Sequence, residues 1–137
     1  MLGVILQHWY AYHSKKTMRY PYAAVGLSGM YSTKTLSRLC NGDVIWVVEG
    51  PTKFALVDCF QYSDTEYPPF ASDYSKFEIR VLGNHSLLGG SSYPLNVADK
   101  WFAELHSRFI TKQKFFNLLT TELEIIEGLR LLSGIKL

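Results

Sequence analysis

Residues 41–62 read NGDVIWVVEGPTKFALVDCFQY, and this stretch decides the fold class. Asn41, Gly42 and Asp43 form a turn signal, in which Gly42 suits a left-handed backbone. The runs 43–49 and 54–62 are rich in β-branched and aromatic residues, which is typical of strands. Residues 50–53 between them are Gly-Pro-Thr-Lys, a sequence typical of a turn. The stretch therefore predicts a β-hairpin of two strong strands.

Two more strands are predicted outside this hairpin. Residues 4–12 are apolar and aromatic throughout and predict a central strand that is buried on both faces. In residues 76–82, Phe77, Ile79 and Val81 alternate with polar residues, which predicts a half-buried strand. Residues 13–22 are polar and basic and are expected to form a loop.

Three helices are predicted around these strands. A short helix is expected over residues 32–39, capped by Ser32. Asn96 is the expected cap of a second helix, and Thr121 with Glu124 forms a capping box for a last one. We therefore expect one α+β domain over residues 1–137, with a small, curved, mostly antiparallel β-sheet or barrel flanked by helices.

The composition indicates a globular chain of one domain. The 137 residues are 47% hydrophobic and 19% charged, which excludes an intrinsically disordered chain. The net charge of +2 permits nucleic-acid binding without requiring it. Cys40 and Cys59 lack metal-ligand spacing, and we expect reduced thiols. The chain shows no signal peptide and no membrane-spanning run, so we expect a cytoplasmic protein without membrane contact.

The order of the motifs resembles that of a known superfamily. Residues 31–50, YSTKTLSRLCNGDVIWVVEG, resemble the core of PUA-like domains, especially of the EVE and YTH groups. In those groups a short helix leads into a Gly-Asp turn and an apolar strand. The runs FALVDCFQY (54–62), KFEIRVL (76–82) and LNVADKWF (95–102) resemble the segments that follow. The resemblance covers most of the chain, although each motif is short.

This resemblance implies a small barrel-like sheet with a pocket at one end. Such pockets take up a single flipped nucleobase of DNA or RNA, with or without a modification, and need no cofactor. EVE-like modules in bacteria often act as sensors in modification-dependent restriction. The 137 residues have no room for a nuclease domain as well, so the expected arrangement is either a lone reader module with a separate nuclease chain as partner or a module cut from a longer protein.

Aromatic and polar residues near the resembling segments are candidates for such a pocket. Tyr31 and Trp46 are the first candidates for a stacking platform, and Trp9 is the next. Trp46 also fits a plain core position in an apolar strand. Ser32, Thr33 and His13 are candidate polar readers of the base. Ser32 also fits the role of a helix cap that takes no part in binding.

Basic residues beside these candidates are expected phosphate contacts. Lys15, Lys16 and Arg19 form the densest basic cluster, and Lys34 and Arg38 lie one turn apart on the expected short helix. The alternative is ordinary solvated charge.

The sequence also leaves alternatives to base binding. The chain contains no G-x-S-x-G, no P-loop and no H-E-x-x-H, so we expect no catalytic residue and no metal ligand. One alternative is a protein–protein interaction domain with an apolar patch on a helix around residues 114–119. Another is a small-molecule-binding domain or enzyme on the same scaffold, with His13 or His85 as acid or base.

Overall fold

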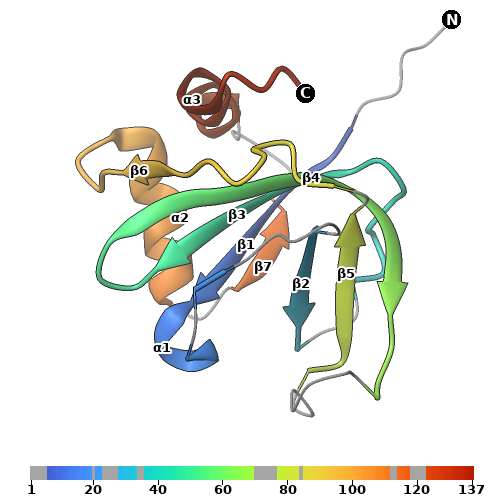
Figure 1. The fold of residues 1–137 in the computed structure, drawn as a ribbon. Coiled ribbons are helices and arrows are strands. Elements are labelled where there is room, and N and C mark those ends of the chain that lie inside the picture. Colours follow the sequence, from blue (N-terminus) through green and yellow to red (C-terminus); the bar gives the residue numbers. More distant parts are fainter. Residues whose placement is uncertain are drawn as a thin grey trace, which may run out of the picture.

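The computed structural model describes residues 6–19, 21–22, 28–33, 36–69, 77–83, 85–111, 114–117 and 123–137. Within these residues the chain is mixed α and β (Figure 1). The strands are β1 (His8–Ser14), β2 (Ser28–Ser32), β3 (Val44–Gly50), β4 (Phe54–Glu66), β5 (Ile79–Gly83), β6 (Tyr93–Leu95) and β7 (Phe115–Asn117). The helices are α1 (Lys15–Met18), α2 (Lys100–Ile110) and α3 (Leu123–Ser133). None of the described helices is long and apolar enough to cross a membrane.

The strands form one curved, mostly antiparallel sheet. Its order is β2-β5-β4-β3-β1-β7, and β6 pairs with the start of β4. One pair is parallel: β1 lies beside β3 over its whole length, from His8 opposite Val44 to Ser14 opposite Gly50. The two end strands, β2 and β7, do not pair with each other in the described part of the chain. The sheet is therefore curved but not closed into a barrel.

The long strand β4 produces the curvature. Its first part pairs with β3, and its last part, from Tyr62 to Glu66, pairs with β5. Figure 1 shows β4 arching across the top of the molecule and then turning down beside β5. The β5–β2 pair is thereby carried to the opposite side of β1 and β3 from helices α2 and α3.

Two hydrophobic cores lie on the two faces of the central strands. Tyr10 and Trp46 point to the face covered by α2 and α3, where they pack with Phe102 and Leu105. The other face is covered by β2 and β5. The residues of this second core are Trp9, Ala11, Met30, Ile45, Val47, Phe60, Ile79 and Val81. Strands β1 and β3 are therefore buried on both faces, as predicted for the first strand.

A β-bulge in β4 places a charged residue in the second core. The β3–β4 register shifts so that Val48 pairs with Leu56 but Val47 pairs with Asp58, and Val57 is the extra residue. Asp58 consequently shares the inner face with Val47, and it is completely buried. Bulges redirect side chains in this way because they break the strict alternation of a strand.

The predicted hairpin is confirmed. Strands β3 and β4 are antiparallel neighbours, and the turn before β3 has Gly42 at a φ of +92°, the left-handed conformation expected there. The strand expected over residues 76–82 is present as β5. The coarse expectation of an α+β domain with a mostly antiparallel sheet therefore holds.

Two expectations in the first part of the chain are wrong. Ser32 does not cap a helix over residues 32–39: it is the last residue of β2, and residues 36–40 are not helical. Pairing with β5 outweighs the local helix signal here. The expected loop over residues 13–22 contains the one-turn helix α1, because Ser14 Oγ accepts a hydrogen bond from Thr17 N.

The later part of the chain departs from prediction at the start of α2 and at residues 114–117. Asn96 does not begin α2; its side chain accepts a hydrogen bond from Ala98 N, and the helix starts at Lys100. Helix α3 ends at Gly134, which has a φ of +77°, while Thr121 of the expected capping box lies outside the described residues. The helix expected around residues 114–119 is the strand β7 where it is described.

Candidate functional site

A cavity of about 290 Å³ lies where the curved sheet fails to close. Its walls include consecutive residues of three segments: 12–14 at the end of β1, 29–33 of β2 and 114–116 around β7. Consecutive side chains of a strand point to opposite faces, so the cavity must face the edges of these strands. The remaining lining residues are Thr17, Met18, Tyr22, Phe77 and Arg80.

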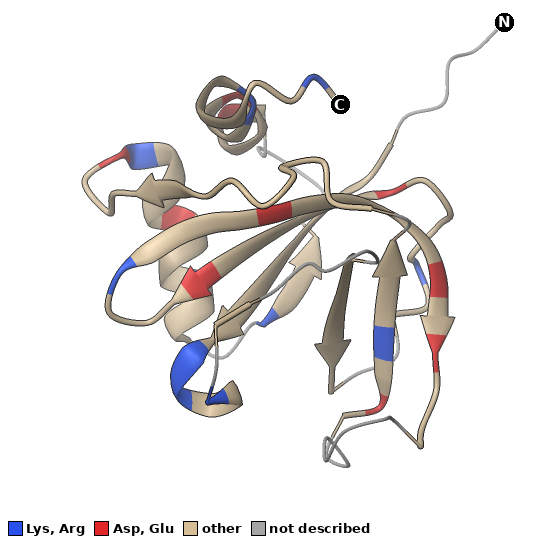
Figure 2. Cartoon of the chain, in the orientation of Figure 1, with Lys and Arg blue, Asp and Glu red and all other residues tan. Residues whose placement is uncertain are grey.

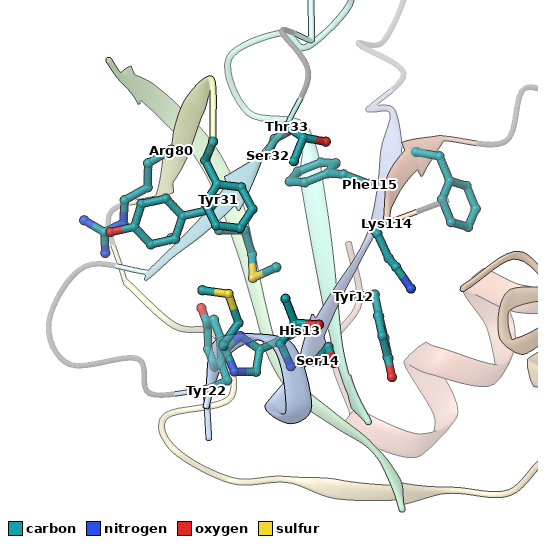
Figure 3. A pocket seen from close by; sticks show the side chains of 16 residues that line it. Tyr12, His13, Ser14, Tyr22, Tyr31, Ser32, Thr33, Arg80, Lys114 and Phe115 are labelled. Carbon is teal, nitrogen blue, oxygen red and sulfur yellow. Dashed lines mark hydrogen bonds between the residues drawn. The ribbon is translucent and has the colours of Figure 1, made fainter. Parts of the chain in front are cut away.

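Aromatic rings form much of the cavity wall (Figure 3). Tyr31 and Phe77 pack with their ring centroids 5.3 Å apart and their planes tilted by 35°. The guanidinium of Arg80 lies 5.5 Å from the centre of the Tyr31 ring, within cation–π distance. Phe115 of β7 adds a third ring to the lining, and Figure 3 shows it near Ser32 and Thr33. The cavity therefore presents flat apolar surfaces from more than one strand.

His13 is the most buried polar ring of the cavity. It is 5% exposed and shares the inner face of β1 with Trp9 and Ala11. Burial lowers the pKa of His13 below its usual 6.5, with a further lowering from Lys15 and an opposing effect of Glu49. The imidazole is therefore neutral at pH 7, with one nitrogen that donates and one that accepts a hydrogen bond.

Tyr22 stands beside His13 and is held at both its backbone and its side chain. The two rings meet edge to face, 5.6 Å apart. The backbone N–H of Tyr22 donates to Glu49 Oε2 at 2.6 Å, and its hydroxyl donates to Asp58 Oδ2 at 2.5 Å. Burial raises the pKa of the Tyr22 phenol, and the Asp58 carboxylate raises it further. The phenol therefore keeps its proton and donates it in the hydrogen bond to Asp58.

Positive side chains surround the cavity mouth. Figure 2 shows Lys and Arg gathered on and beside α1, whose Thr17 and Met18 line the cavity. Lys15 Nζ lies 3.9 Å from Glu49 Oε1 and forms an ion pair with it. Lys114 Nζ donates to the carbonyl of Phe109 at 2.8 Å, and its burial lowers its pKa. Lys114 thus completes the end of α2, whereas Lys16 and Arg19 project from α1 as exposed residues.

The structure brings four of the six predicted pocket residues together. Tyr31, Ser32, Thr33 and His13 all line the cavity, although His13 comes from β1 and the other three come from β2 and the residue that follows it. Ser32 is buried and Thr33 is exposed.

The other two predicted pocket residues are in the cores, which corrects the expectation for them. Trp9 Nε1 donates to Asp43 Oδ2 at 3.0 Å, and Trp46 Nε1 donates to His8 Nδ1 at 2.9 Å. Both indoles are buried because β1 and β3 are central strands covered on both faces. Neither lines the cavity.

The predicted phosphate contacts divide in the same way. Lys15, Lys16 and Arg19 lie on or just after α1, beside the cavity. Arg38 lies at the opposite end of β1: its carbonyl accepts from Gln7 Nε2 at 2.9 Å, roughly 20 Å along the strand from Ser14. That distance separates Arg38 from the cavity. Lys34 lies outside the described residues.

Sequence reasoning missed several lining residues. Tyr12, Tyr22, Phe77 and Phe115 are aromatic, and Arg80 and Lys114 are basic, so their types suited the expected chemistry. The alternation in residues 76–82 placed Phe77 on the apolar face of a strand and gave no sign of a cavity. Two signals were usable: the proximity of Tyr22 to the basic cluster at residues 15–19 and, more weakly, that of Lys114 to Phe115 and Phe116.

The described residues also include side-chain types that can ligate a metal or react as thiols. No group of three or more His, Cys, Asp and Glu side chains among them is arranged to hold a metal ion. Both cysteines are free thiols, Cys40 exposed and Cys59 buried.

Comparison with known proteins leaves the function to be argued from this cavity. No protein-family model matches the sequence, and no curated protein is similar enough to indicate a relationship.

Proposed function

We propose that this chain binds nucleic acid and takes a single nucleobase, with or without a modification, into the cavity between β2 and the end of β1. The observation that carries the proposal is the convergence of an aromatic wall, buried polar groups and exposed cations. Tyr31, Ser32, Thr33 and His13 line one cavity, and the basic helix α1 borders it. A flipped base needs these three features, because it must be stacked upon, read at its edge and held by its phosphates.

The aromatic wall supports base stacking. Tyr31 and Phe77 already pack against each other with tilted planes, and each is only partly buried, so their ring surface can receive a further flat ring. Stacking of a base on such a ring contributes about 1–3 kcal/mol. The volume of about 290 Å³ lies at the small end of ligand cavities, which suits one base and excludes a folded oligonucleotide.

The polar groups of the wall support reading of the base edge. Ser32 and Thr33 supply hydroxyls that can donate and accept, and neutral His13 supplies a ring with one donor and one acceptor nitrogen. Lys16 and Arg19 are placed to contact the flanking phosphates, which would give affinity that does not depend on sequence.

The architecture supports a PUA-like, EVE-type module. That resemblance implies a small barrel-like sheet with a pocket at one end, and this chain has a strongly curved, open sheet with a cavity beside its unpaired edges. In this proposal the chain is the sensor part of a modification-dependent restriction or defence system, and the nuclease belongs to another part of the same protein or to a partner chain. The free thiols Cys40 and Cys59 are in line with the cytoplasmic location that such a role requires.

The test is a titration of the protein with labelled oligonucleotides by fluorescence anisotropy. DNA duplexes and single-stranded RNA are each used plain and with methylated or hydroxymethylated bases, at low and moderate salt. We expect tighter binding to one base type, and we expect Tyr31→Ala to weaken it by at least tenfold because the stacking surface is lost. Tyr67→Ala, which removes an exposed tyrosine that does not line the cavity, is the matched control.

The outcomes separate the possible results. Loss of binding in Tyr31→Ala but not in Tyr67→Ala supports the cavity as the binding site. Equal weakening by both variants would place the nucleic acid elsewhere on the surface. Absence of binding to every oligonucleotide at low salt would overturn the proposed function.

A further inference from the structure

Asp58 lies behind the cavity wall at a position that costs stability. It is completely buried in the second core, where the bulge in β4 has turned it inward. Its carboxylate accepts hydrogen bonds from the hydroxyl of Tyr22 at 2.5 Å and from the neighbouring backbone amide, Cys59 N, at 2.8 Å. Transferring a carboxylate into an apolar core is unfavourable unless it is well paired, and apolar replacements are often as stable or more stable.

The hydrogen bond from Tyr22 connects this buried carboxylate to the cavity. Asp58 does not line the cavity, but Tyr22 does. Tyr22 is fixed at two points, because its backbone N–H also donates to Glu49, which pairs with His13 in the β1–β3 register. A ring fixed in this way has one position and one orientation.

His13 packs directly against this ring. The edge of one ring meets the face of the other at 5.6 Å, and Figure 3 shows the two side by side at one end of the cavity. The imidazole thus packs against a phenol that is held by a hydrogen bond at its hydroxyl and another at its backbone. The chain of contacts runs from Asp58 through Tyr22 to His13, and from there to the ligand space.

We infer that Asp58 and Tyr22 form a positioning pair, which orients His13 and thereby sets the base selectivity of the cavity. This inference rests on the proposed function, since it concerns the ligand of the same site. Asp58 acts without touching the ligand, and its burial is retained for the site and not for the stability of the fold.

The test separates the role in binding from the role in stability by a pair of variants. Tyr22→Phe keeps the ring but leaves the Asp58 carboxylate without its hydroxyl partner. We expect its Tm to fall by about 5 °C and its affinity for the best oligonucleotide to fall about tenfold. In the double variant Tyr22→Phe with Asp58→Leu, both polar groups are gone. We expect the Tm to return to that of the natural protein or above, while the affinity stays tenfold reduced.

Selectivity and ring orientation are the second readout. The ratio of dissociation constants between the best and the plain oligonucleotide should fall towards one in both variants. The ¹⁵N spectrum of His13 should show a change of environment in both. Tyr62→Phe is the matched control, because it removes a tyrosine hydroxyl that bonds Thr65 at 2.6 Å outside the cavity. This control should keep both the affinity and the ratio.

Three results are informative. Recovery of affinity together with Tm in the double variant would overturn the inference, since the pair would then be purely structural. Unchanged selectivity in both variants would also overturn it, while binding by the natural protein would still support the proposed function. If the natural protein binds no oligonucleotide, the proposed function fails and the inference fails with it.

Discussion

His8, at the start of β1, is a buried imidazole whose protonation opposes folding. Its Nδ1 accepts a hydrogen bond from Trp46 Nε1 at 2.9 Å, and the two rings are stacked with centroids 6.2 Å apart. Burial, with a smaller effect of Arg130, lowers the pKa of His8 to about 4, against the opposing effect of Asp43. The folded protein therefore holds this side chain in its neutral form.

A pH dependence of stability follows from this shift. Above pH 6.5 His8 is neutral in both states and contributes no slope. Between pH 6.5 and about 4 the unfolded chain binds the proton more readily than the folded protein. Lowering the pH through this range therefore lowers the free energy of unfolding, by up to about 3 kcal/mol in total. Urea denaturation at several pH values measures it. In His8→Asn, whose amide oxygen can still accept from Trp46, this part of the slope should disappear; parallel curves for both proteins would contradict the assignment.

At Arg19 the backbone conformation is unfavourable for a side chain, whereas the proposed contact with phosphate requires one. It is the one described non-glycine residue with a positive φ, at 66°, and it ends the single turn of α1. Glycine is favoured at this position, because a side chain in the left-handed region costs about 1 kcal/mol. Arg19→Gly should therefore raise the free energy of unfolding by up to about 1 kcal/mol and weaken oligonucleotide binding.

The weakening should carry an electrostatic signature. If Arg19 contacts one phosphate, the slope of log K against log salt for single-stranded DNA should become shallower by about 0.7 in Arg19→Gly. Lys136→Gly removes an exposed cation near the C-terminus and should leave the slope unchanged. A slope that Arg19→Gly does not alter would remove Arg19 from the interface.

At this scale the sequence predicted residue types better than residue positions. Tyr31, Ser32, Thr33 and His13 do meet at one cavity. Trp46 was equally plausible by type, but whether an aromatic ring in a strand faces a core or a cavity depends on what covers that face. The covering helices α2 and α3 lie more than fifty residues further along the chain, so no local pattern could exclude it.

At the scale of the elements, strong local patterns were predicted and tertiary pairings were not. The β3–β4 hairpin follows from alternation and a turn signal, both of which are local. Residues 32–39 carry a helix signal, yet Ser32 belongs to β2 because that strand pairs with β5, about fifty residues away. The bulge at Val57 could not be predicted either. Val57 and Asp58 follow the ordinary alternation of apolar and polar residues, and only the pairing with β3 reveals the extra residue.

The contact between α2 and α3 yields a test at this scale. Gly128 lies in the middle of α3, where a glycine costs about 1 kcal/mol relative to alanine. A Cβ at this position would overlap the indole of Trp101 on α2, a rigid ring. Gly128→Ala should therefore lower the free energy of unfolding by about 1–3 kcal/mol in spite of its better helix propensity. Thermal and urea denaturation would measure the change.

A matched substitution on the same helix controls this result. Leu131 is 85% exposed, so Leu131→Ala should change the stability by less than about 0.5 kcal/mol. If Gly128→Ala instead stabilised the protein, the two helices would have to be further apart than the structure shows.

At the scale of the whole molecule, the cavity is a product of topology. β2 and β7 are the ends of the sheet, and the curvature of β4 brings β2 opposite the end of β1 without pairing the strands. This arrangement depends on the parallel β1–β3 pair, whose partners are 36 residues apart, and on the β2–β5 pair. Alternation predicts that strands exist, but not their order, so a closed barrel and an open, curved sheet could not be distinguished.

The open sheet makes a prediction about what a ligand does to it. A molecule in the cavity contacts β2 on one side and β1, α1 and β7 on the other. Binding therefore connects the two ends of the sheet, which are otherwise joined by the second core and by β4. Hydrogen exchange followed by mass spectrometry, with and without a saturating oligonucleotide, should therefore show slower exchange in peptides from both sides, residues 12–18 and 28–33. The extra protection should reach RT ln(1 + [L]/Kd), about 2.7 kcal/mol at a hundredfold excess over Kd.

The distribution of this protection decides between two binding modes. Peptides from α3, which do not line the cavity, are the internal reference and should exchange at the same rate in both samples unless the whole chain opens at once. Protection on both sides of the cavity means that the ligand enters it and closes the gap in the sheet. Protection of α1 alone would mean that the nucleic acid lies on the basic surface and leaves the cavity empty, because phosphate contacts at Lys16 and Arg19 need no contact with β2.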